Sequence, residues 1–230
     1  MTMVQWIIIA YIGATTGLQL VLGRIADRHG LKRIYVTGLA VYTVAVGLIG
    51  LRLPVASSFE WVLVWRVAQA VGYGMMIASG PALVTRLFPD AQRGRALGMM
   101  SSIGTIGMIA ATLGGGYLVE AFGWSSIFLA RLPIGVIAIG LAVFVSKEHR
   151  SDGAAPFSYT NAAVLFFALT SLVLFINLGG RMGWGNPAVL ALAVVCVVAT
   201  ALFVAFERRS SAPIVALDAL TPRINRALVA

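Results

Sequence analysis

The sequence predicts an all-α polytopic membrane protein with about seven transmembrane helices, and three observations lead to this fold class. First, 60% of the 230 residues are hydrophobic and only 11% are charged, against about 45–50% and about 25% in ordinary soluble domains. Second, the charges are clustered, so that long uncharged runs cover residues 1–23, 34–51, 67–85, 96–119, 132–146, 153–180 and 182–206. Third, these runs lack the two-residue alternation of barrel strands, whereas a helix of about 20 apolar residues crosses a bilayer with its backbone hydrogen bonds satisfied.

The residues between the runs mark the boundaries of each expected helix. The first run ends at the basic stretch 24–33, and the second begins after this stretch and ends near Arg52. The third begins at Glu60, and the fourth lies between Arg95 and Glu120. Charged or glycine-rich links bound the last three. We therefore expect crossings at 4–23, 34–53, 60–85, 95–119, 126–146, 158–179 and 187–206.

The basic residues predict which side of the membrane each link faces. With these crossings, one side collects Arg24, Arg28, Lys32, Arg33, Arg86, Arg93, Arg95, Lys147, Arg150, Arg208, Arg209, Arg223 and Arg226. The other side has Arg52, Arg131 and Arg181, together with Trp6, Trp61, Trp65, Trp124 and Trp184. Cytoplasmic loops carry the excess of Lys and Arg, and tryptophan favours membrane interfaces. We therefore expect a cytoplasmic C-terminus and an external Met1, and this orientation in turn predicts a further helix upstream.

Several functional classes are disfavoured by the same residues. The net charge of +9 lies in scattered membrane links and not on a continuous basic face, so we expect no nucleic-acid partner. His29 and His149 have no nearby metal-ligand partners, and no nucleophile lies beside a histidine. Cys196 lies inside an apolar run, where a small core residue is the expected role. We expect no metal, no cofactor and no enzyme activity.

Arg66 is the residue within an expected helix that most suggests a function. An arginine at a helix centre costs about 2.5–3.5 kcal/mol on insertion scales, so it needs a pathway or a partner. On a helix, Arg66, Gln69 and Tyr73 share one face, which predicts a polar stripe toward the bundle interior. The alternative is that Arg66 extends to the interface beside Trp65.

A glycine-rich helix is expected over 95–119. It contains Gly104, Gly107, Gly115 and Gly116. Small residues let helices approach closely in lipid, so these positions predict either a specific contact or general close packing.

Two motifs resemble those of the major facilitator superfamily, and within it the fourteen-span drug:proton antiporters of the multidrug efflux type. The stretch "GRIADRHGLKR" is similar to that superfamily's loop motif G-x-L-a-D-r-x-G-r-k, with Gly23, Asp27, Arg28, Gly30 and Lys32 in register. The stretch "RVAQAVGYG" is similar to the fourth-helix motif R-x-x-Q-G-x-G, with Ala70 in place of its first glycine. The stretch "ATLGGGYLVEAFGW" matches only the paired glycines of the antiporter motif G-P-x-x-G-G.

The resemblance implies a secondary transporter that exports amphipathic small molecules by alternating access, with the proton gradient as energy source and no cofactor. It implies that the loop residues Gly23, Asp27, Arg28, Gly30, Lys32 and Arg33 form a cytoplasmic gate. It also implies that Arg66, with Gln69 and Tyr73, contributes to proton coupling or to the substrate pathway. The implied location is a cell membrane, as a multi-pass protein of the bacterial inner membrane.

By the same resemblance, the chain covers the family's second to eighth helices. Residues 1–150 would form a partial N-terminal repeat of five spans, 151–210 two extra linker spans, and 211–230 the start of the connection to the C-terminal half. The partners would be the lipid bilayer, a small-molecule substrate, the missing N-terminal helix and the C-terminal half of the parent protein. Two alternatives stay open: uptake of a small metabolite, and a membrane scaffold that transports nothing.

Overall fold

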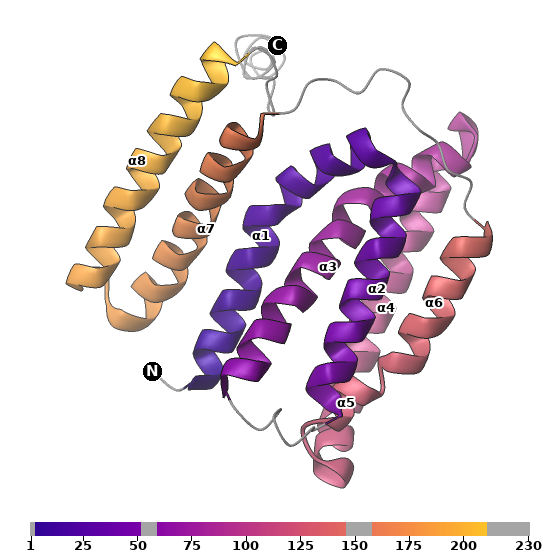
Figure 1. The fold of residues 1–230 in the computed structure, drawn as a ribbon. Helices are drawn as coiled ribbons and strands as arrows, with labels where there is room; N and C mark the ends of the chain where they lie inside the picture. Colours follow the sequence, from indigo (N-terminus) through magenta and orange to yellow (C-terminus); the bar gives the residue numbers. More distant parts are fainter. Residues whose placement is uncertain (1–2, 52–58, 146–157, 211–230) are drawn as a thin grey trace, which may run out of the picture.

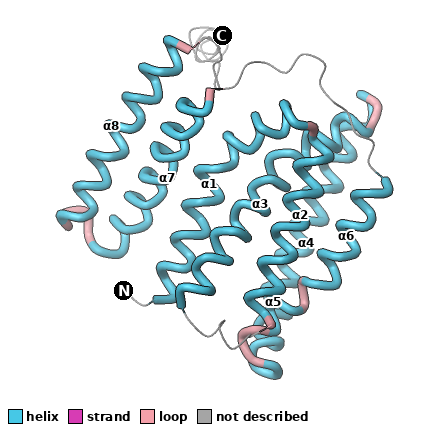
Figure 2. The backbone as a smooth tube through the Cα atoms, viewed as in Figure 1, coloured by secondary structure: helices cyan, strands magenta, loops and turns pink. Residues whose placement is uncertain are grey.

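The computed structural model describes residues 3–51, 59–145 and 158–210, and every regular element in these ranges is a helix (Figures 1 and 2). The helices are α1 (Met3–His29), α2 (Leu31–Gly50), α3 (Phe59–Leu87), α4 (Asp90–Phe122), α5 (Ser126–Leu129), α6 (Leu132–Val145), α7 (Tyr159–Met182) and α8 (Pro187–Arg209). Two stretches lie outside the described residues, namely 146–157 and 211–230. They contain Lys147, His149, Arg150, Arg223 and Arg226, and Arg52 is also outside the described residues.

The helices have the length and composition that a membrane requires. Six segments of the described chain are long and apolar enough to span a bilayer, with α5 and α6 counted as one segment. Helix α1 adds a further 27 residues, about 40 Å at 1.5 Å per residue. The predicted all-α polytopic membrane fold is therefore confirmed, with six or seven spanning helices.

Three helices form the centre of the bundle. Helices α1 and α2 both pack on α3, and α6 packs on the other side of α2 (Figure 1). At the α2–α3 crossing, Gly38 and Gly72 face each other so closely that a Cβ on Gly72 would lie 2.6 Å from the backbone nitrogen of Tyr42. The backbones of α2 and α3 thus touch without side chains between them, as small residues allow in membrane bundles.

The expected single crossing at 126–146 is two helices in the structure. Helix α5 ends at Leu129, a turn covers Ala130 and Arg131, and α6 begins at Leu132. Pro133 has no backbone N–H, and its ring would clash with the carbonyl of Leu129 if one helix continued. We therefore attribute the break between α5 and α6 to Pro133. The length of the hydrophobic run alone does not indicate this break.

Helices α7 and α8 form an antiparallel hairpin that packs against α1 (Figure 1). Val21 of α1 is buried in one cluster with Ala162, Leu165 and Phe203. Gly17 of α1 lies against Phe166, whose ring carbon would be 2.8 Å from an added Cβ. The hairpin is therefore held to the bundle through a close contact along α1.

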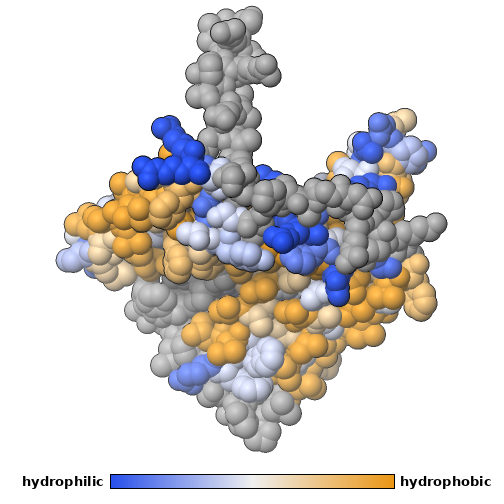
Figure 3. All heavy atoms as spheres, turned by 45° about the horizontal axis from the view of Figure 1, so that its top comes forward, coloured by the Kyte–Doolittle hydropathy of each residue, from blue (hydrophilic) through white to orange (hydrophobic). Residues whose placement is uncertain are grey.

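Most basic residues of the described chain lie at one end of the helices. The C-termini of α1, α3 and α8 and the N-termini of α2 and α4 lie at this end (Figure 1). Figure 3 shows hydrophilic residues gathered there and hydrophobic residues over the flanks. The described basic residues of the predicted cytoplasmic links are thus on one side of the bundle, as the expected alternation of the loops requires.

Helix α4 contrasts with the others because none of its 33 residues is buried. Its apolar side chains are open, with Leu113 75% exposed. In a bilayer, lipid tails or further helices cover such a face. A buried glycine contact on α4 is therefore not formed by the part of the chain that the structure describes.

Candidate functional site

Arg66 lies in the third turn of α3 and contacts aromatic rings from two other helices and a polar side chain of α3 itself. Its guanidinium carbon lies 4.8 Å from the ring centre of Phe128 and 5.9 Å from that of Tyr11. Its Nη1 donates to Oε1 of Gln69, 3.3 Å away. These contacts place the half-buried Arg66 toward the interior of the bundle and not only toward the interface.

Gln69 and Tyr73 share this face of α3 as the sequence predicts. Gln69 is 1% exposed and accepts the hydrogen bond from Arg66. Tyr73 contacts the site indirectly, because its ring lies 6.3 Å from that of Tyr11, which also faces Arg66. The structure thus brings the three residues into one cluster.

Arg131, Tyr42, Tyr11 and Phe128 belong to the same cluster and were not predicted as site residues. Nη1 of Arg131 donates to the hydroxyl of Tyr42 at 3.5 Å. The ring centre of Tyr11 lies 6.3 Å from that of Tyr73 and 5.9 Å from the guanidinium carbon of Arg66. The sequence signal for Arg131 is that it is a lone arginine in the otherwise apolar stretch "FLARLPIG". Its position in the chain indicates only an external link.

The turn between α4 and α5 positions Phe128, and Arg131 follows directly after α5. Gly123 ends α4 with a φ of 81°, a left-handed conformation that glycine adopts without a steric cost. The hydroxyl of Ser126 then donates to the carbonyl oxygens of Gly123 at 2.6 Å and Leu118 at 2.8 Å. Phe128 packs against Val46 and Ile49 of α2, which positions its ring under the guanidinium of Arg66.

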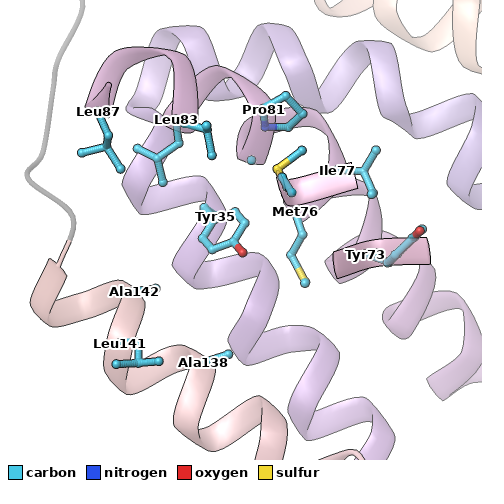
Figure 4. Close-up of a pocket in the computed structure, with 14 residues that line it drawn as sticks. Tyr35, Tyr73, Met76, Ile77, Pro81, Leu83, Leu87, Ala138, Leu141 and Ala142 are labelled. Carbon is cyan, nitrogen blue, oxygen red and sulfur yellow. The ribbon is translucent and has the colours of Figure 1, made fainter. Parts of the chain in front are cut away.

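A second feature is an apolar pocket of about 760 Å³ between α2, α3, α4 and α6. Figure 4 shows Tyr35 and Met76 near the middle of the lining, Tyr73 at one edge, and Ala138 and Leu141 on α6. Its lining contains no charged side chain. Tyr73 lines this pocket and also contacts Tyr11, so the pocket adjoins the cluster around Arg66.

The predicted gate loop is a tight turn between α1 and α2. Gly30 has a φ of 102°, a region that residues with a Cβ rarely adopt. Asp27, Arg28 and Arg33 are exposed, and Asp27 has no partner among the described residues.

Two residues of the loop contact helices. Nζ of Lys32 donates to the carbonyl oxygen of Val143 at 2.9 Å. This bond satisfies a free carbonyl at the C-terminal end of α6 and joins that end to α2. A Cβ on Gly23 would lie 3.9 Å from Ala78 of α3, an ordinary contact distance.

The four predicted glycines of α4 have no neighbour in the described structure. Added Cβ atoms at Gly104, Gly107, Gly115 and Gly116 would meet nothing within 4 Å. Gly104 lines the apolar pocket. The role of this stripe therefore stays a prediction.

Comparison with known proteins agrees with this fold. The family model of the Major Facilitator Superfamily matches residues 1–226. The chain is 30% identical to the riboflavin transporter RibZ of Clostridioides difficile over 76% of this chain and 37% of that protein.

Two relatives that match more of the chain are named for resistance. The multidrug resistance protein Stp of Mycobacterium tuberculosis is 30% identical over 93% of this chain and 39% of Stp. The methylenomycin A resistance protein of Streptomyces coelicolor is 31% identical over 93% of this chain and 44% of that protein. The chain thus spans about two fifths of the length of these relatives. With membrane-spanning helices throughout and a family match over almost its whole length, the chain belongs to the Major Facilitator Superfamily.

Proposed function

We propose that this chain is part of a secondary transporter that exports drugs or other amphipathic compounds by alternating access, coupled to proton influx. The observation that carries the proposal is the Arg66–Gln69 pair, a polar contact inside a membrane-spanning bundle. Intramembrane ionisable residues of this kind mark substrate or ion pathways. The resistance names of two relatives support export as the direction.

We further propose that residues 1–150 form a partial N-terminal repeat, residues 151–210 two linker spans, and residues 211–230 the start of a connection to a C-terminal half. The division at 150 is supported by the α7–α8 hairpin, which packs on the bundle mainly through α1. Transporters of this kind enclose substrate between two repeats. A second repeat is therefore required for alternating access.

The open faces of α4 and α6 support the presence of further helices. The apolar pocket between α2, α3, α4 and α6 has no charged lining, and an apolar helix would fill it better than a charged segment. The exposed glycines of α4 would let such a helix or the second repeat approach closely. The coding sequence on both sides tests this: further apolar helices support the proposal, and in-frame stop codons on both sides contradict it.

The proposed orientation places the basic loops and the C-terminus in the cytoplasm of a bacterial cell, with the protein in the inner membrane. The described basic residues support this orientation by the positive-inside rule. Fusion of alkaline phosphatase to the C-terminus tests it, because phosphatase folds only outside the cytoplasm. An active fusion would contradict the orientation.

Export is tested with the complete encoded protein in cells loaded with ethidium. We expect faster loss of dye than in control cells, and a protonophore should abolish the difference. Arg66→Ala should reduce the rate about 10-fold or more at equal surface level, because it removes the cation and the partner of Gln69. Arg181→Ala is the matched control, since Arg181 is an exposed arginine at the end of α7. Normal export by Arg66→Ala would contradict a role in the pathway.

Uptake of a small metabolite is the second candidate. The relative named for riboflavin transport favours it. Cells that accumulate riboflavin through the complete protein, and that do not lose ethidium faster, would support uptake over export.

A further inference from the structure

The α7–α8 hairpin docks on α1 through a glycine and an apolar cluster. Gly17 is buried, and a Cβ added there would clash with the hydroxyl of Thr170 and lie 2.8 Å from a ring carbon of Phe166. One turn further along α1, Val21 is 9% exposed and packs in one cluster with buried residues of α7 and α8. Helices in lipid associate through this kind of close packing, because no hydrophobic force drives them together there. The hairpin therefore fits the surface of α1 closely.

The hairpin is itself held closed at both of its ends. At the open end, Nδ2 of Asn161 donates to Oε2 of Glu207 at 2.6 Å. At the turn, the ring centre of Trp184 lies 5.3 Å from that of Phe175. The indole also covers Gly179, where an added Cβ would clash with it. Because α7 and α8 are joined at both ends, a movement of α7 is a movement of the whole hairpin.

Helix α1 is packed against the bundle as well as against the hairpin. A Cβ on Gly74 of α3 would lie 2.9 Å from a methyl group of Leu22 on α1. Ala26 of α1 is buried in one cluster with Leu31 of α2 and Leu83 of α3. Helix α1 runs as one helix to His29, so it carries both the hairpin contact and the first residues of the predicted gate loop.

We infer that the α7–α8 hairpin is a brace for the helix that carries the gate loop, and that it stays docked on α1 and moves with α1, α2 and α3 as one body during transport. This inference rests on the proposed function, because a transport cycle of this kind rocks one bundle against another. The alternative is a hairpin that slides along α1 or leaves it in each cycle. Such a movement would break the packing at Gly17 and Val21.

A disulfide between α1 and α7 tests the inference on the complete encoded protein in proteoliposomes. Because a Cβ on Gly17 would touch the side chain of Thr170, Gly17→Cys with Thr170→Cys brings two Cβ atoms within reach of a disulfide, which needs about 3.5–4.5 Å. Val21→Cys with Leu165→Cys is the second pair, used if the first does not fold. Both pairs are made in a cysteine-free background that includes Cys196→Ala. The single-cysteine variants are the controls for the oxidant.

Three measurements compare the oxidised with the reduced protein. Maleimide labelling of the denatured protein counts the free thiols and so reports whether the disulfide has formed. Thermal unfolding reports whether the disulfide fits the folded structure. Ethidium transport driven by a pH gradient reports whether the cycle still runs. The first two measurements do not depend on transport.

If the hairpin is a docked brace, the disulfide forms in most molecules and raises the unfolding temperature. The transport rate of the oxidised protein then stays within about twofold of that of the reduced protein. A pair that stays reduced, or a disulfide that lowers the unfolding temperature, would overturn the docking. A disulfide that forms and slows transport more than about twofold, with recovery on reduction, would overturn the movement as one body. If the wild type transports no ethidium, the proposed export fails, and thiol count and unfolding temperature still decide whether the hairpin is docked.

Discussion

Glycine residues of this chain differ in what surrounds them, although the sequence presents them alike. Gly38 and Gly72 allow two backbones to touch at the α2–α3 crossing. Gly104 and Gly107 on α4 have open space around them. The contact on Gly72 comes from its place on the face of α3 that meets α2, and this face depends on how the helices are rotated.

Gly72→Ala should destabilise the protein by about 1–3 kcal/mol, because its Cβ would lie 2.6 Å from the nitrogen of Tyr42 and 2.7 Å from the carbonyl oxygen of Gly38. Both atoms belong to backbones, so neither can turn aside. Gly180→Ala is the matched control, since nothing lies within 4 Å of its added Cβ, and alanine favours a helix by about 0.5–1 kcal/mol. Thermal unfolding in detergent measures both. Equal stability of the two variants would argue against the close crossing.

At the scale of elements, the α7–α8 hairpin is joined at its open end by a buried polar contact. Nδ2 of Asn161 donates to Oε2 of Glu207 at 2.6 Å, and both residues are 3% exposed. Ser158 caps α7 by accepting from the backbone nitrogen of Asn161 at 3.3 Å. The carboxylate of Glu207 thus lies at the N-terminus of α7, where the helix dipole favours a negative charge. Hydropathy and residue spacing do not predict this contact.

Asn161→Ala should destabilise the hairpin by about 1–3 kcal/mol, because the buried carboxylate of Glu207 loses this donor. Asn177→Ala on the same helix is the control, since Nδ2 of Asn177 donates within its own helix, to the carbonyl oxygen of Val173. Chemical denaturation of the two variants in mixed micelles gives the comparison. A loss in Asn177→Ala as large as that in Asn161→Ala would contradict a specific role for the Asn161 contact.

At the scale of the whole molecule, the gate loop lies at the end of the bundle where the other basic loops gather. Lys32 joins α2 to α6 there, whereas Asp27 is exposed with no partner in the described structure. A charge that is free within one bundle is suited to contact a second bundle. The gate proposed from the family resemblance therefore requires the complete protein.

Asp27→Asn should leave the topology and the surface level unchanged and should slow ethidium export about 10-fold or more, because it removes the charge of the proposed gate contact. Asp90→Asn is the control, because Asp90 is also exposed on this side and pairs only locally with Arg93 at 2.7 Å. Such an exposed pair contributes about 0–1 kcal/mol. Export by Asp27→Asn at the rate of the control would leave the loop with the role of a turn alone.

The sequence by itself determined that the chain is a series of apolar helices, the approximate position of each, and the end of the bundle at which the basic loops gather. These properties follow from hydropathy and charge, which are local and can be counted along the chain. The shared face of Arg66, Gln69 and Tyr73 was also predictable, because the helical repeat sets it.

Only the tertiary structure decided which distant residues meet. It placed Arg131 and Phe128 beside Arg66, because the turn at Gly123 and the break before Pro133 direct α5 onto α2. It joined Asn161 to Glu207 across the hairpin. Every spanning helix of this chain is apolar on most sides, so hydropathy does not indicate which face meets a neighbour and which meets lipid. Close packing of small residues determines which face of a helix meets a neighbour. This packing depends on the rotation and crossing of helices that are far apart in the chain.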